Sequence, residues 1–258
     1  MKGCLKRQPF LCTMKKIGIV CLIFLPYLVK AQNDRVQDDN TIVWAQLFGN
    51  VKLNNKWDFL PEYQWRRVNG FKHWQQSLLR VAIQHRFNNQ LSVAAGYAWI
   101  ETFPYGDFPL AANGTFPEHR IHEQVQLRNT LGKLTINQRL RIEQRWIGRV
   151  QPNTNREIED WIYSNRFRHL LRLQYPLMNN NKLYTALADE VFISAGKKVG
   201  ANIFDQNRVM LILGSKISNQ ISFEAGFINQ TLFQGRRVNN NTIVQDNNGA
   251  TLALIVSL

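Results

Sequence analysis

Apolar and polar residues alternate almost without interruption over residues 133–147 of this chain. Side chains of an extended strand point to opposite faces with a period of two residues. One face of this segment therefore carries Leu134, Ile136, Leu140, Ile142 and Trp146, and the other carries Thr135, Asn137, Arg139, Arg141, Glu143 and Arg145. Such a segment requires hydrocarbon on one side and water or counter-charges on the other.

Similar runs recur along the chain, which predicts an all-β protein. They lie at roughly 41–53, 56–68, 73–87, 90–102, 119–131, 133–147, 160–175, 182–194, 206–217, 220–233 and 249–258. The pattern is typical of a single antiparallel transmembrane β-barrel, in which the outside meets lipid and the inside is polar. Because single-chain bacterial barrels contain an even number of strands, we predict about twelve strands, with ten as the alternative.

The connections between these runs alternate in length. Short ones contain Asn or Gly, which suit tight hairpins, as at Asn54-Asn55, Asn88-Asn89 and Gly132-Lys133. Longer ones span 103–118, 148–159, 195–205 and 234–248, and the last of these either extends a hairpin or hides an added strand. Short turns at one rim and long loops at the other are the arrangement of outer-membrane barrels.

Aromatic residues cluster near the predicted strand ends and favour a membrane barrel over its main alternative. That alternative is a water-soluble barrel with the same alternation but an apolar interior. Trp and Tyr concentrate where membrane meets water. The predicted girdle residues are Trp44, Trp57, Trp65, Trp74, Tyr97, Trp99, Trp146, Trp161, Tyr163 and Tyr175.

The first 31 residues have the features of a cleaved secretory signal peptide. Lys15 and Lys16 precede an apolar stretch over 17–28, and Val29-Lys30-Ala31 ends it with small residues at the positions that a signal peptidase reads. Met14 is an alternative start. The predicted organisation is a signal peptide over 1–31, a short polar segment over 32–40 and a barrel domain over 41–258.

Charge and cysteine usage narrow the function classes. Residues 1–31 hold six lysines and arginines and no acid, so their removal lowers the net charge from +14 to +8. All three cysteines also lie there, which removes disulfides, thiolate metal sites and a cysteine nucleophile from the mature chain. The remaining arginines alternate with aliphatic residues instead of forming a basic cluster, so we predict no nucleic-acid partner.

The inward face of the predicted barrel is rich in charge. Its predicted arginines are Arg80, Arg86, Arg120, Arg128, Arg139, Arg141, Arg145, Arg166, Arg168, Arg172 and Arg208, and its predicted acids are Glu62, Glu143, Glu190 and Glu224. One interpretation is a structural ion-pair network that fills a narrow barrel. The other is an anion-preferring lumen, in which fixed positive charge concentrates small anions.

Catalytic and metal chemistry find little support in the sequence. His119 and His122 lie three apart on a predicted strand and so face opposite ways, which prevents them from sharing a metal. A lipid hydrolase would pair a serine with a histidine such as His85 or His169. We predict no cofactor, no metal site and no assigned catalytic residue.

The predicted loop over 103–118 is rich in aromatics and proline. Tyr105, Phe108 and Phe116 are its candidate contact residues for a partner or a sugar. The alternative is a loop folded over the mouth of the barrel. The sequence identifies no protein partner.

Several segments resemble the bacterial domain-of-unknown-function family 2490. They are Pro117-Glu118-His119-Arg120-Ile121, Arg141-Ile142-Glu143-Gln144-Arg145, Arg166-Phe167-Arg168, Leu171-Arg172-Leu173, Asp189-Glu190-Val191-Phe192, Phe204-Asp205-Gln206-Asn207-Arg208 and Glu224-Ala225-Gly226-Phe227-Ile228-Asn229-Gln230. The resemblance covers residues 40–258 and implies an integral outer-membrane barrel without assigned activity. It supplies no catalytic residues. Leu258 replaces the terminal aromatic residue that is common in outer-membrane barrels.

Three functional hypotheses follow from these features. The first is an envelope structural or interaction role through long outer loops, and the second is a narrow anion-preferring channel or porin. The third is a lipid-acting outer-membrane hydrolase. All three place the chain in the bacterial outer membrane, in contact with its lipid.

Overall fold

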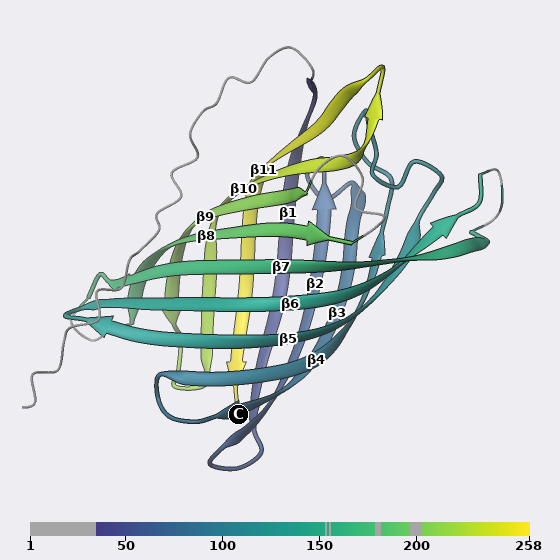
Figure 1. The fold of residues 1–258 in the computed structure, drawn as a ribbon. Coiled ribbons are helices and arrows are strands. Elements are labelled where there is room, and N and C mark those ends of the chain that lie inside the picture. The colour runs from purple at the N-terminus through teal and green to yellow at the C-terminus, as the bar shows by residue number, and fades with distance from the viewer. Residues whose placement is uncertain (1–34, 153, 155, 179–181, 197–202) are drawn as a thin grey trace, which may run out of the picture. The chain divides into compact units, whose positions relative to one another are not determined.

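A computed structural model describes residues 35–152, 154, 156–178, 182–196 and 203–258. These residues form one sheet that closes into a barrel (Figure 1). The strands are β1 (Arg35–Lys52), β2 (Trp57–Val68), β3 (His73–Arg86), β4 (Leu91–Thr102), β5 (Phe116–Leu131), β6 (Leu134–Val150), β7 (Ile158–Pro176), β8 (Leu183–Ala195), β9 (Phe204–Lys216), β10 (Ile221–Val238) and β11 (Asn241–Ser257). Each predicted run overlaps one of these strands.

The described residues form eleven strands, so the predictions of twelve and of ten were both wrong. Strand direction alternates around the barrel, and an odd number therefore leaves the first and last strands pointing the same way. β1 and β11 close the barrel as a parallel pair, from Arg35 opposite Thr242 to Asn50 opposite Ser257. A parallel ladder also satisfies backbone N–H and C=O groups, so closure does not require an even number.

The segment 234–248 is a hairpin and not a long loop. β10 runs to Val238 and β11 begins at Asn241, so only Asn239 and Asn240 form the turn. Both have positive φ, 49° and 67°, as a two-residue type I′ hairpin requires. Of the two interpretations of this segment, the extended hairpin is confirmed.

The barrel has two different ends. The strand ends that flank 69–72, 103–115, 151–157, 196–203 and 239–240 lie at one end, called here the loop end. The strand ends that flank 53–56, 87–90, 132–133, 177–182 and 217–220 lie at the other, called the turn end. β1 starts at Arg35, so residues 35–40 of the predicted short polar segment belong to the first strand. The predicted signal peptide, with its alternative start at Met14 and cleavage before Gln32, lies outside the described residues.

The outward face of the barrel is mainly apolar, and it also carries polar pairs such as Gln144 with Glu123 and Asn207 with Asp189. Several of its side chains are between 39% and 58% exposed, namely Leu79, Ile83, Val125, Leu127, Phe167, Leu211, Leu213 and Leu254. Arginines that alternate with them, such as Arg80, Arg166 and Arg168, are buried inside. A water-soluble barrel would show the reverse arrangement. No helix in the described part of the chain is long and apolar enough to cross a membrane.

Most of the predicted girdle aromatics also lie outside. Trp57, Tyr97, Trp99, Trp161, Tyr163 and Tyr175 are each exposed on the outer surface. Trp44 is an exception, because its side chain is only 2% exposed and packs with Ile42, Val68, Tyr105 and Ile228 inside the barrel. The prediction for Trp44 was wrong because strand-end position alone does not specify the face.

Candidate functional site: the charged barrel interior

Glu143 of β6 lies at the centre of the interior ion-pair network. One of its oxygens accepts hydrogen bonds from Arg166 at 2.6 and 2.9 Å, and the other accepts one from Arg168 at 2.6 Å. All three residues are almost completely buried. Charge-assisted contacts of this kind are the strong ones. They offset the desolvation of the three charges only because the geometry is good.

Two further carboxylates are also shared between arginines. Glu118 of β5 accepts from Arg120, at 2.5 and 2.8 Å, and from Arg145, at 2.5 and 3.2 Å. Glu190 of β8 accepts from Arg139 at 2.9 Å, and from Arg168 at 2.7 and 3.1 Å. Arg168 thus links Glu143 to Glu190. The network is continuous across β5, β6, β7 and β8.

Simpler pairs lie on either side of this network. The Nη1 atom of Arg80 donates to both carboxylate oxygens of Glu62, at 2.7 and 2.8 Å. Arg172 of β7 reaches Glu224 of β10 at 2.6 and 3.1 Å, and the Tyr184 hydroxyl donates to the same carboxylate. At the turn end, Arg86 pairs with the buried Asp58 at 3.0 Å. Arg128 lies exposed at that end and has no ion-pair partner among the described residues.

Three interior arginines hydrogen-bond no carboxylate among the described residues. Arg66 donates to Gln64 and Gln76, Arg141 donates to Gln124, and Arg208 donates to Gln206. The nearest carboxylates to Arg141 and Arg208 lie at 3.8 and 3.7 Å. Neutral amide oxygens satisfy donors but do not neutralise charge. The described interior therefore carries excess positive charge.

The interior is crossed by contacts between strands that are not neighbours in the sheet. Gln75 of β3 accepts a hydrogen bond from the Trp44 indole of β1 at 2.6 Å and donates to Gln230 of β10 at 3.4 Å. Gln75 is the extra residue of a β-bulge, since Arg66 pairs with Gln76 and Arg67 with Trp74. A bulge turns a side chain away from the regular alternation. These contacts are possible only through the middle of the barrel.

The guanidinium groups of Arg66 and Arg208 both contact the ring of Trp44. Their Cζ atoms lie 3.9 and 4.9 Å from its centroid. Arg208 also lies 4.5 Å from the ring centroid of Phe192. Aromatic faces attract cations, most strongly where water is excluded. Aromatic rings hold these two arginines in place where carboxylates do not.

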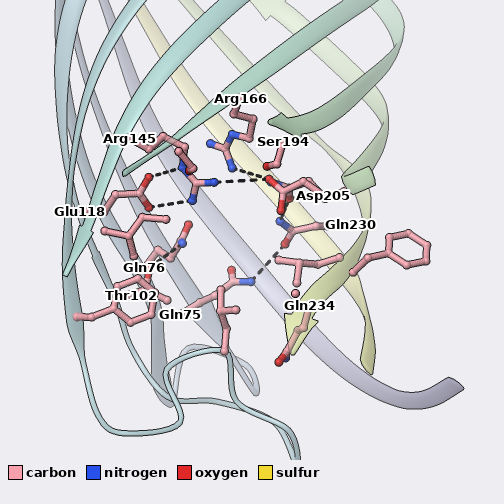
Figure 2. A pocket seen from close by; sticks show the side chains of 18 of the residues that line it. Gln75, Gln76, Thr102, Glu118, Arg145, Arg166, Ser194, Asp205, Gln230 and Gln234 are labelled. Atoms are coloured by element: carbon pink, nitrogen blue, oxygen red, sulfur yellow. Dashed lines mark hydrogen bonds and ion pairs between the residues drawn. The ribbon is translucent and has the colours of Figure 1, made fainter. Parts of the chain in front are cut away.

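Two internal cavities adjoin this group. The loop-end cavity has a volume of about 190 Å³, and the turn-end cavity one of about 180 Å³. Arg66 and Arg208 line both cavities. Figure 2 shows the loop-end cavity, with Arg145 between Glu118 and Asp205, and with Gln75 directed toward Gln230. Both cavities are lined by more arginines than acids.

The segment 103–115 is folded into the loop end of the barrel. The Tyr105 hydroxyl accepts from Gln75 at 3.1 Å and from Asn247 at 3.3 Å. Burial raises the pKa of this phenol. Backbone amides of Asp107 and Phe108 donate to the carboxylate of Asp38 at 3.3 and 3.1 Å. Tyr105 is 9% exposed, Phe108 and Phe116 are half-buried, and Phe116 is the first residue of β5. The interpretation of a loop folded over the mouth therefore fits better than that of free contact residues.

His119 and His122 face opposite sides of the sheet, as strand geometry predicts. The His119 ring contacts the Tyr97 hydroxyl on the outer face at 2.5 Å, whereas His122 is buried inside. Within the described residues, no group of acidic, histidine or cysteine side chains could hold a metal ion. The hydrogen bonds of those residues include none between a serine and a histidine.

Sequence reasoning missed several interior residues. Glu118 and Asp205 were assigned to loops, but β5 begins at Phe116 and β9 at Phe204. Arg66 and Asp58 share the parity of Glu62, so the alternation of β2 could have identified them. Gln75 could not be found in this way, because a bulge breaks the alternation that the prediction uses.

Comparison with known proteins identifies the family. Residues 41–241 match the model of the family described as protein of unknown function (DUF2490). An uncharacterized protein of Methylorubrum extorquens is 26% identical over 224 residues, which cover 83% of this chain and 87% of that protein. No solved structure matches the chain. The chain belongs to the DUF2490 family.

Proposed function

We propose that this member of the DUF2490 family is an integral β-barrel of the bacterial outer membrane with a filled interior. The observation that carries the proposal is the inverted distribution of side chains, with leucines exposed and arginines buried. In water, exposed apolar surface on this scale is unfavourable, whereas acyl chains accept it. A closed barrel also satisfies its backbone without water, as a membrane requires.

The filled interior favours an envelope structural or interaction role over free solute passage. Gln75, Trp44 and Gln230 meet in the middle of the barrel, and Tyr105 enters from the loop end. The long β10–β11 hairpin and the other loop-end connections would then face the outside of the cell. They are the parts of the barrel available for contact with another envelope component.

Fractionation of cells tests the location. The full-length chain, tagged after Leu258, should be recovered in the outer-membrane fraction and should require detergent for extraction. A variant that lacks residues 1–31 should remain in the cytoplasm and serves as the control. Recovery of the full-length chain as a detergent-free periplasmic protein would contradict the proposal.

An anion-preferring channel is the second candidate, and one observation favours it. Ten interior arginines accompany seven interior carboxylates, Asp38 included, when the Arg86–Asp58 pair at the turn end is left out. The purified barrel in a planar bilayer decides between the two functions. We expect no unitary conductance, and steps with a reversal potential that favours chloride over potassium would establish the channel instead.

A further inference from the structure

We infer that the loop-end cavity is a binding site for a small oxyanion, a free phosphate or the phosphate or carboxylate group of a small solute, held by Arg66 and Arg208. This inference does not rest on the membrane location. It concerns a ligand that is retained inside the barrel and not one that passes through it.

The interior of the barrel holds more positive than negative charge. Glu118, Glu143 and Glu190 are each hydrogen-bonded by at least two arginines. Among the described residues, Arg66 therefore has no carboxylate partner, and Arg208 has only the shared Glu190, at 3.7 Å. Asp38 is occupied by the amides of the loop that closes this end. A buried ion without a counter-charge carries a desolvation penalty of several kcal/mol. A bound anion removes this penalty.

Unsatisfied hydrogen-bond donors line the cavity. Arg208 and Ser164 both line it and are 7% and 5% exposed. Within the part of the chain that the structure describes, the Nε atom of Arg208 and the Oγ atom of Ser164 are buried and have no hydrogen-bond partner. Buried polar groups in native proteins are nearly always paired, so an unpaired donor next to a cavity indicates a missing acceptor.

The other side chains that line the cavity also suit an oxyanion. The side-chain amides of Gln206 and Gln230 lie beside the arginines. Their N–H groups can donate to the oxygens of an oxyanion in either of its protonation states. Guanidinium groups match oxyanions through two-point contacts. Trp44 contacts both guanidinium groups by their faces. Among the described residues this leaves the Nε and Nη1 groups of Arg208 without a hydrogen bond, and each Nη atom of Arg66 keeps one N–H beyond its bonds to Gln64 and Gln76. Chloride, which offers no paired oxygens, would gain less from this geometry.

The volume of the loop-end cavity and the segment that covers it limit the size of the anion that can bind. Tyr105 and Phe108 belong to the segment that covers the loop end, and the cavity of about 190 Å³ lies beneath it. One water molecule needs a cavity volume of roughly 10–15 Å³. The space is therefore sufficient for a phosphate with several waters, or for a small anionic solute, but not for a polymer.

The test measures thermal unfolding of the purified barrel in detergent, with inorganic phosphate compared with chloride at equal ionic strength. Equal ionic strength keeps screening constant, so that only specific binding raises the midpoint. Arg66→Gln and Arg208→Gln remove the proposed ligands. Arg141→Gln is the matched control, because Arg141 also hydrogen-bonds no carboxylate but lines neither cavity.

We expect a saturable rise in the wild type and in Arg141→Gln, and an apparent affinity for phosphate that is weaker by about tenfold or more in Arg66→Gln and Arg208→Gln. Arg208→Lys retains the charge without the planar fork and serves if Arg208→Gln does not fold; it should also bind more weakly. Equal responses to phosphate and chloride in the wild type would overturn the inference, as would an unchanged phosphate response in both arginine variants. Titration with acetate and with a sugar phosphate then distinguishes a carboxylate from a phosphate head group.

Discussion

Arg166 and Glu143 form a buried ion pair at 2.6 Å between neighbouring strands, and Glu143 also accepts from Arg168. Removing the carboxylate would take one of two carboxylate partners from each of two buried guanidinium groups, since Arg166 also contacts Asp205 and Arg168 also contacts Glu190. We therefore expect Glu143→Gln to lower the free energy of unfolding by about 3–5 kcal/mol. Urea unfolding of the refolded barrel in detergent measures this.

The control for that prediction is an exposed pair. Glu159 lies 3.3 Å from Arg149, and both side chains are 50% exposed. Glu159→Gln should change the free energy of unfolding by less than about 1 kcal/mol. Similar losses in both variants would show that the interior network does not act as described.

The loop that closes the barrel depends on Gly106. Its φ is +75°, and a Cβ atom there would lie 2.4 Å from Oδ2 of Asp38, whose carboxylate holds the loop amides. Gly106→Ala should therefore displace the loop and increase hydrogen exchange of the Phe108 amide. Gly70→Ala is the control, because Gly70 has a similar φ of +61° but no atom within 4 Å of the added Cβ. Equal exchange in the two variants would contradict the role of Asp38.

The parallel closure of the barrel depends on Gly249. A Cβ atom at this position would lie 1.7 Å from the carbonyl oxygen of Ile42 on β1. Gly249→Ala should therefore reduce the fraction of the chain that migrates as a compact barrel on an unheated gel. Gly132→Ala, in an open turn with no atom within 4 Å, should keep that fraction close to the wild-type value. Normal compaction of Gly249→Ala would mean that β1 and β11 do not close as described.

Alternation alone predicted the eleven strand positions and the faces of residues such as Leu140 and Arg141, because pleat geometry is local. It also placed Arg166 and Glu143 on the same side of adjacent strands. The number of strands was mispredicted because an even-number rule was preferred to the eleven runs themselves. Closure through a parallel pair joins residues about 207 positions apart, as Ile42 and Gly249 show, and no local pattern encodes it.

The details of the interior could be predicted only in part. Regular strands place Arg80 opposite Glu62, and the prediction of an inward charged face included both. The position of Gln75 depends on a bulge, and that of Tyr105 on how a loop folds, so neither follows from a period of two. Trp44 has the parity of an interior residue, but its contacts with two arginines depend on strands far away in the sequence.

The central claim is that the leucine-bearing face meets lipid while the arginines fill the interior, and thiol labelling in vesicles tests it most directly. Residues 32–258 contain no cysteine, so single substitutions give unambiguous signals. Leu140→Cys and Leu211→Cys, both 58% exposed near the middle of their strands, should resist a water-soluble maleimide, whereas Leu177→Cys at the turn end should react. Reaction of Cys at 140 and 211 as fast as at 177, with the barrel folded and in vesicles, would show that this face is in water and would contradict the account.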